Sequence, residues 1–188
     1  MIELKNVSFS YGEREILSDF NLRVENGQCV CLKGYSGCGK TTVLRLVLGL
    51  EKPVAGEIIK PERPSVVFQE DRLIPSLTLK KNILLPLEKG RYESALELIY
   101  EAGLKDALSK RVAELSGGMK RRAAIVRAVA FQGDALILDE PFNGIDAENR
   151  EIMAKMIKRE FLEKGKPVLM VSHIPADAEV LNSTVAEM

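Results

Sequence analysis

The segment that most constrains this chain is a glycine-rich octapeptide, Gly34-Tyr35-Ser36-Gly37-Cys38-Gly39-Lys40-Thr41. Two glycines separated by four residues and followed by Lys40 and Thr41 match the phosphate-loop pattern. Glycine lets successive backbone N–H groups point at phosphate oxygens, Lys40 adds a compact positive charge, and the Thr41 hydroxyl can ligate Mg²⁺. The octapeptide therefore predicts binding of a nucleoside triphosphate with Mg²⁺.

The residues on either side of the octapeptide support this prediction. Residues 27–33 predict a short buried strand, and residues 42–48 predict a helix. A strand, a glycine loop and a helix N-terminus in this order direct backbone N–H groups and the helix dipole at an anion. This context argues against a coincidental surface loop.

Length and composition indicate one compact unit of 188 residues, of which 46% are hydrophobic and 29% charged. Basic and acidic residues number 27 each, so no overall positive charge attracts nucleic acid. The apolar runs 43–50 and 83–87 fall short of the roughly 18 residues that a membrane span needs. Residues 1–5 lack signal-peptide features, and three cysteines fit a reducing compartment. We expect a cytoplasmic protein with no nucleic-acid partner, in which Cys29 and Cys31 fill one face of a strand.

Alternating strand and helix patterns predict an α/β fold with a mostly parallel sheet, which opens onto its ligand at the carboxyl ends of the strands. Residues 2–11, followed by Leu22 and Val24, predict an N-terminal antiparallel β subdomain. The other expected elements are strands at 57–59, 66–68, 135–139 and 167–171 and a helix over 147–164.

The middle of the chain has a different pattern, with no strand expected over 73–115 and with helices over 92–102 and 116–131. We therefore expect a helical subdomain, about 73–132, inserted into the core of a single domain that spans 1–188. The chain ends fifteen residues after His173, which predicts that no C-terminal regulatory domain follows.

Two carboxylates, Asp139 and Glu140, follow the predicted hydrophobic strand. One can hold Mg²⁺ and the other can orient or deprotonate an attacking water, as phosphoryl transfer requires. Because adjacent strand residues point to opposite faces, we expect the two side chains to have different roles. We assign Asp139 to the metal and Glu140 to the water. An isolated Asp–Glu pair more often only starts a loop, so this assignment depends on the phosphate loop.

Ser116, Gly117 and Gly118 begin the predicted helix over 116–131. Backbone N–H groups at such a helix start are free to bind an anion, which predicts a second phosphate site. The alternative is a simple N-cap with a flexible approach.

In this order, the motifs resemble those of the nucleotide-binding subunit of an ATP-binding cassette (ABC) transporter, over essentially the whole chain. The Walker A loop of that family corresponds to Gly34–Thr42, and its signature corresponds to Leu115–Met119. The Walker B strand corresponds to Leu136–Asp139 and the D-loop to Asn143–Asp146. The residues that the resemblance assigns to ATP are Tyr11, Gly34, Tyr35, Ser36, Gly37, Cys38, Gly39, Lys40, Thr41, Thr42, Ser116, Gly117 and Gly118. Those that it assigns to catalysis are Gln69, Glu140 and His173, and those that it assigns to Mg²⁺ are Thr41, Gln69 and Asp139.

The resemblance also implies how such a chain works: two cassettes pair head to tail, and Ser116–Gly118 of one close over the triphosphate bound at Lys40 of the other. ATP closes the pair and hydrolysis releases it, which gives ATP the differential affinity that an energy-transducing switch needs. Two departures are visible. Met119 stands where the family usually has Gln, and Asn143–Asp146 is a variant D-loop.

Four basic residues, Lys120, Arg121, Arg122 and Arg127, follow the signature. We expect them on an exposed helix face, solvated or paired, because no aromatic platform for nucleic acid accompanies them.

The apolar segments 73–79 and 83–87 exceed what a short insert needs for its own packing. We expect them to form, in part, a groove for a cytoplasmic helix of a membrane partner, which Asp at Leu73 or Leu77 would disrupt.

The resemblance implies an ATPase subunit of a bacterial-type importer, in a homodimer or paired cassette on the inner face of the membrane, under separately encoded permease subunits. An extracytoplasmic binding protein would deliver the substrate. Residues 67–75, Met119 and residues 139–142 resemble the group that imports nitrate, sulfonates, taurine or thiamine precursors. Alternatives are an exporter subunit and a soluble ABC ATPase of DNA repair or translation. A kinase-type enzyme would leave Leu115–Gly118 unexplained.

Overall fold

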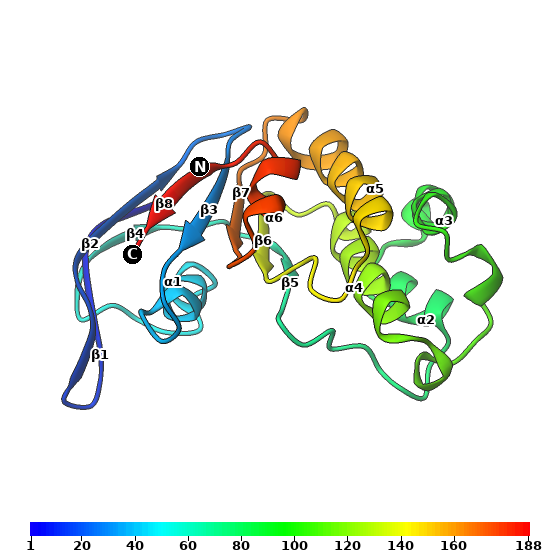
Figure 1. The fold of residues 1–188 in the computed structure, drawn as a ribbon, viewed down its shortest axis with the longest axis horizontal. Coiled ribbons are helices and arrows are strands. Elements are labelled where there is room, and N and C mark those ends of the chain that lie inside the picture. The colour runs from blue at the N-terminus through cyan, green and yellow to red at the C-terminus, as the bar shows by residue number, and fades with distance from the viewer.

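In the computed structural model, which describes residues 1–188, two sheets and a group of helices lie side by side along the long axis (Figure 1). Strands β1 (Ile2–Tyr11), β2 (Arg14–Val24) and β4 (Ala55–Ile59) form an antiparallel sheet in the order β2-β1-β4. The predicted N-terminal antiparallel pair is confirmed. The strand predicted at 57–59 pairs with β1, so it belongs to this sheet rather than to the parallel one.

The second sheet has five parallel strands in the order β5-β6-β7-β3-β8. Their bounds are Cys29–Lys33 for β3, Ser65–Val67 for β5, Leu136–Asp139 for β6, Val168–Val171 for β7 and Thr184–Glu187 for β8. Sequence reasoning missed β8, whose residues are mostly exposed and carry no apolar alternation. The prediction of a mostly parallel sheet is confirmed.

Six α-helices complete the fold. They are α1 (Lys40–Val47), α2 (Leu79–Leu84), α3 (Tyr92–Glu101), α4 (Gly117–Phe131), α5 (Ala147–Ile157) and α6 (Pro175–Val180). Short 3₁₀ turns occur at Lys89–Arg91, Lys105–Ala107 and Val112–Glu114. The single helix predicted over 147–164 is wrong in one respect, because α5 gives way to a π-helical turn at Lys158–Leu162. None of these helices combines the length and the apolar character that crossing a bilayer requires.

The parallel sheet separates two hydrophobic cores, and strand alternation decides which side chain enters which core. On β3, Val30 and Leu32 face the core of 17 buried residues beneath the antiparallel sheet and α1. Cys29 and Cys31 face the core of 34 buried residues, which includes α4 and α5. Burial raises the pKa of the Cys29 thiol to about 12, so this cysteine stays a neutral core residue as predicted.

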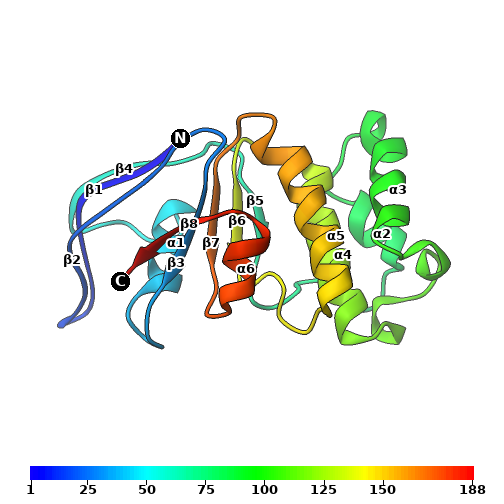
Figure 2. The same ribbon diagram turned by 45° about the horizontal axis from the view of Figure 1, so that its top comes forward.

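Helices α2, α3 and α4 come from residues 73–132, which contribute no strand to either sheet. The turned view shows α4 and α5 between the parallel sheet and the outer helices α2 and α3 (Figure 2). Residues 73–132 therefore form a helical layer at the side of the core.

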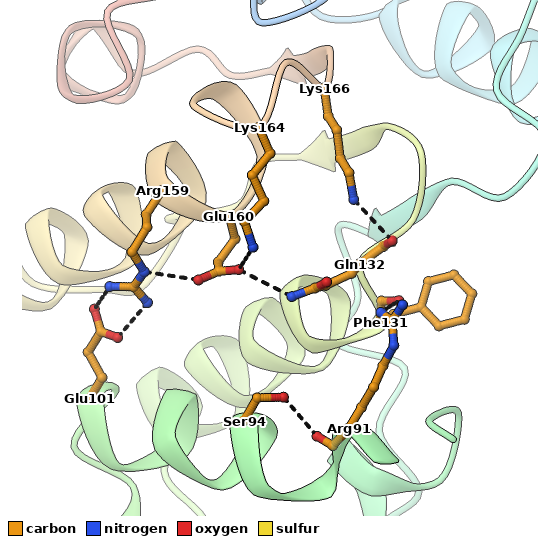
Figure 3. Close-up of polar contacts among 9 residues, drawn as sticks. All are labelled: Arg91, Ser94, Glu101, Phe131, Gln132, Arg159, Glu160, Lys164 and Lys166. Carbon is orange, nitrogen blue, oxygen red and sulfur yellow. Dashed lines mark hydrogen bonds and ion pairs between the residues drawn. The ribbon is translucent and has the colours of Figure 1, made fainter. Parts of the chain in front are cut away.

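A network of ion pairs and hydrogen bonds joins this helical layer to the π-helical turn and to the segment before β7 (Figure 3). Arg159 of the π-helical turn holds both carboxylate oxygens of Glu101 on α3, at 3.1 and 2.8 Å. At the end of α4, Arg91 donates to the Phe131 carbonyl at 2.9 Å, and Lys166 donates to the Gln132 carbonyl at 3.2 Å. The Arg159 and Glu101 side chains are 46% and 33% exposed, so their pairing orients the layer and contributes at most about 1 kcal/mol to stability.

Candidate nucleotide-binding site

A polar cavity of about 490 Å³ lies at the carboxyl ends of the parallel strands. The chain segments that follow β3, β5, β6 and β7 all contribute side chains or backbone to it, as do the β1–β2 hairpin and α1. The residues that line it are Tyr11, Arg14, Ile16, Gly34, Ser36, Gly37, Gly39, Lys40, Thr41, Thr42, Gln69, Asp139, Glu140, Val171 and His173. Residues that are distant in sequence thus converge on one cavity.

The glycine loop has the conformation that its sequence requires. Gly39 has φ 108°, which strains any residue with a side chain, and a Cβ there would lie tightly, 3.0 Å from Ile16 Cγ2. Lys40 begins α1, and its Nζ donates to the Gly34 carbonyl at 2.8 Å and to the Tyr35 carbonyl at 2.9 Å. The ammonium group is therefore held over the loop, beside the cavity.

Two predicted members of the loop do not line the cavity. Tyr35 is 75% exposed, and Cys38 is half-buried with its Sγ 3.7 Å from Lys40 Nζ. Tyr35 and Cys38 therefore contribute backbone to the loop, and their side chains do not line the cavity.

The two carboxylates line the same cavity. Strand β6 ends at Asp139, and Glu140 already has a left-handed φ of 50°, so strand alternation does not extend to it. Asp139 is 9% exposed, and burial together with the Glu140 charge raises the pKa of its carboxyl group. A cation beside Asp139 would favour its charged form, so the oxygens of Asp139, Thr41 and Gln69 suit a hard divalent ion.

The His173 side chain contacts the Glu140 carboxylate, and both residues line the cavity. Its Nδ1 lies 2.9 Å from both carboxylate oxygens, and one proton cannot be directed at both. Glu140 Oε2 is buried and receives no well-aligned hydrogen bond, so it can accept a proton from another donor. The hydrogen bond and the charge of Glu140 raise the pKa of His173 above its ordinary value of 6.5.

This pairing predicts a titration that can be measured directly, because His173 is the only histidine of the chain. Its imidazole resonances should give an NMR titration midpoint above 6.5 in the wild-type protein. In Glu140→Gln the charged partner is lost, and the midpoint should fall toward 6.5. A midpoint that is the same in both proteins would contradict the pairing, and Glu179→Gln serves as a control outside the cavity.

The signature segment lies away from the cavity of its own chain. Ser116 is the N-cap of α4, and its Oγ accepts a hydrogen bond from the Met119 N–H at 3.3 Å. Gly118 packs beside the Gly144 carbonyl, which a Cβ would approach to 3.3 Å. Ser116 and Gly117 are exposed. The helix tip therefore has the geometry of an N-cap, beside the D-loop, with an open outer face.

Sequence reasoning missed two basic residues near the cavity. Arg14 lines it and pairs with Tyr11 across the β1–β2 hairpin, and the Tyr11-Gly12 turn was the available signal. Arg121 was expected on an exposed face, and this is wrong because it is 4% exposed. The run of small and apolar residues at 123–126, all buried, shows that α4 has no freely exposed face near Arg121.

Arg122 and Arg127 are half-buried and paired, and pairing is one of the two alternatives expected for them. Arg122 donates to the Ala102 carbonyl at 2.7 Å, and Arg127 donates to the carbonyls of Asp71 and Arg72 at 2.9 and 2.8 Å. These side chains are structural ties between α4 and its neighbours.

A glycine loop between a parallel strand and a helix, with two carboxylates at the end of another strand of the same sheet, defines a phosphate-loop nucleotide-binding protein. Residues 17–143 match a family model described as ABC transporter, and the chain belongs to that family as an ATP-binding cassette. A solved structure described as the ATP-binding subunit of an ABC transporter superposes on this chain with a TM-score of 0.92 at 28% identity. The whole of this chain aligns with 85% of the chain in that structure.

Curated relatives align with nearly the whole of this chain. An aliphatic sulfonates import ATP-binding protein of Paraburkholderia xenovorans is 37% identical over 98% of this chain, which spans 56% of that protein. One from Rhodococcus jostii is 38% identical, again over 98% of the chain, and is spanned to 77%. A spermidine/putrescine import ATP-binding protein of Lawsonia intracellularis is 38% identical over the whole chain, which spans 56% of it.

Proposed function

We propose that this chain binds and hydrolyses MgATP to drive a membrane permease that imports a small solute. The observation that carries the proposal is that Lys40, Thr41, Asp139, Glu140 and His173, from three separate segments, line one cavity. Hydrolysis of ATP needs charge neutralisation and a positioned water, and these side chains can supply both.

Each residue has a role that fits its position. Lys40 and the loop N–H groups would bind the β- and γ-phosphates, and Tyr11, which is 46% exposed at the rim, would stack on the adenine. Thr41, Gln69 and Asp139 would hold Mg²⁺, which when bound neutralises charge on the phosphates. Glu140 would accept a proton from the attacking water, and His173 would hold the Glu140 carboxylate and approach the γ-phosphate.

A complete site requires two copies in this proposal. The exposed tip of α4, at Ser116–Gly118, would close over the triphosphate of a second cassette, because it does not reach the cavity of its own chain. A solved neighbour described as a dimeric bacterial ABC transporter cassette, 30% identical with a TM-score of 0.85, supports pairing of this kind.

The proposed function also implies a domain arrangement. We infer a single domain over residues 1–188, with a helical subdomain of about 73–132 inserted into the core. Helices α2–α4 support this boundary because α2 and α3 pack on α4 and lie at one side of the parallel sheet.

A groove of about 330 Å³ beside this layer would receive the permease. It is lined in part by Ile74, Leu85, Pro86 and Phe131, and Leu85 is 65% exposed. Leu73, expected in the groove, packs against the larger core instead. We propose that a cytoplasmic helix of the permease fills the groove, which would hold the chain on the inner face of the membrane.

The groove gives a test of the coupling to a membrane protein. Leu85→Asp should reduce co-purification of this chain with the permease subunits at least about tenfold, because a buried carboxylate replaces an apolar contact. Its ATPase rate without the permease should stay unchanged. The matched control is Val185→Asp, an aliphatic side chain 43% exposed on β8. Equal co-purification of both variants and the wild type would reject the groove.

The transported solute depends on the permease and on a binding protein outside the cell. Relatives of nearly equal identity are named for sulfonates and for polyamines, so cassette similarity does not separate these cargoes. We propose a sulfonate-like organic anion, since several of the relatives share that name.

A further inference from the structure

Arg121 is the most fully engaged side chain near the proposed catalytic centre. It lies just over one turn into α4, its side chain is 5% exposed, and all three guanidinium nitrogens donate hydrogen bonds. The acceptors are the carbonyls of Pro141 (2.9 Å), Phe68 (2.6 Å), Gln69 (3.2 Å), Asp139 (2.8 Å) and Glu140 (2.6 Å), and Asp71 Oδ1 (3.2 Å).

These acceptors belong to two separate strand ends. Phe68 and Gln69 follow β5, and residues 139–141 end β6 and begin the next turn. The planar guanidinium directs N–H groups both ways at once, which a lysine with three donors on one nitrogen cannot do. Arg121 therefore joins the segments that carry Gln69 and Glu140 to each other and to α4.

The turn that Arg121 holds is a strained one. Glu140 has φ 50°, a conformation that non-glycine residues adopt only when their surroundings impose it. Arg121 binds the carbonyls of Asp139, Glu140 and Pro141, which are the successive peptide groups of this turn. The guanidinium thus holds the backbone from which the Glu140 carboxylate is directed toward His173.

The same helix carries the signature at its tip. Ser116 and Arg121 are five residues apart on one short stretch of α4, and no flexible connection separates them. A contact that shifts α4 as a rigid body at its tip would also shift the guanidinium that holds these carbonyls.

We propose that Arg121 is a positioning residue, which aims Glu140 and Gln69 and links hydrolysis in its own cavity to the engagement of its signature helix with a second cassette. This proposal rests on the proposed function. Arg127, on the same helix, binds only the carbonyls of Asp71 and Arg72 and does not touch the Glu140 turn.

The test compares Arg121→Lys and Arg121→Gln with Arg91→Gln. Arg91 is the control because it also donates a guanidinium hydrogen bond to an α4 carbonyl, at the far end of the helix. The KM for ATP should change little in all three variants. The kcat should fall about 10- to 100-fold in both Arg121 variants, since a small displacement of a catalytic group costs that much, and stay near wild type in Arg91→Gln.

A second measurement does not depend on activity. With Glu140 no longer aimed at His173, the His173 NMR titration midpoint in Arg121→Lys should move toward 6.5, and in Arg91→Gln it should stay at the wild-type value. The lysine variant keeps the buried charge and serves if the glutamine variant does not fold.

The outcomes separate the two proposals. A wild-type protein without ATPase activity would overturn the proposed function, while the His173 midpoint would still test the positioning role. Wild-type kcat and an unmoved midpoint in folded Arg121→Lys would overturn the positioning role alone. The same holds if Arg91→Gln lowers kcat as much as the Arg121 variants do.

Discussion

Replacing Glu140 by Gln should slow ATP hydrolysis by roughly 10² to 10⁴ while leaving ATP binding intact. The amide keeps the size of the side chain but cannot accept a proton from water, and Glu140 Oε2 is the buried oxygen without a well-aligned partner. Lys40 and the glycine loop are unchanged, so the triphosphate should still bind. Phosphate release under saturating MgATP and equilibrium binding of labelled ATP measure the two effects separately.

The same variant should accumulate an ATP-loaded dimer, because closure is retained and the step that reopens the pair is blocked. Size-exclusion chromatography with and without ATP would detect it. Adding Ser116→Arg should prevent this dimer and leave ATP binding to each chain unchanged, since the new side chain would stand at the exposed tip of α4. An Arg-bearing double variant that still dimerises with ATP would exclude the head-to-tail arrangement. Wild-type hydrolysis in Glu140→Gln would exclude the role of Glu140.

Particular elements show how much of the fold can be predicted from the sequence. The glycine loop was predictable because Gly39 needs both a left-handed φ and a position without a Cβ, which only one residue type satisfies. Strands β3, β6 and β7 were predictable because they are continuous apolar runs buried on both faces. Strand β8 was not, because it lies at the sheet edge, its residues are mostly exposed, and its pairing with β3 uses backbone groups that any residue supplies.

The site was harder to predict wherever its geometry depends on tertiary contacts. Strand alternation could not give the direction of the Glu140 side chain, because β6 ends at Asp139 and Glu140 has a left-handed φ of 50°. Arg121 appeared to be one cation among four after the signature. Its role depends on carbonyls about 20 and 50 residues away in the sequence, which no local pattern displays. Local rules thus predict the elements, and the strained turn at Glu140 follows only from the assembled fold.

Replacing Lys40 by Ala should weaken ATP binding about 10- to 100-fold. A charge-assisted hydrogen bond to phosphate is worth about 1.5 to 3 kcal/mol, and about 1.4 kcal/mol corresponds to a factor of ten in Kd. The variant also loses the hydrogen bonds that hold the ammonium over the Gly34 and Tyr35 carbonyls, so the loop is less well ordered for its ligand. Isothermal titration with a slowly hydrolysed ATP analogue measures the Kd directly.

The matched control is Lys33→Ala, at the end of β3. Lys33 has the same side chain seven residues earlier, and it does not line the cavity. Its Kd should stay within about twofold of wild type, because the half-buried Lys33 is not among the residues that line the cavity. If both alanine variants bind the analogue equally well, the cavity at the strand ends is not where the triphosphate binds. If only Lys40→Ala loses affinity, the loss belongs to the ammonium group of Lys40 and not to the net charge of the chain.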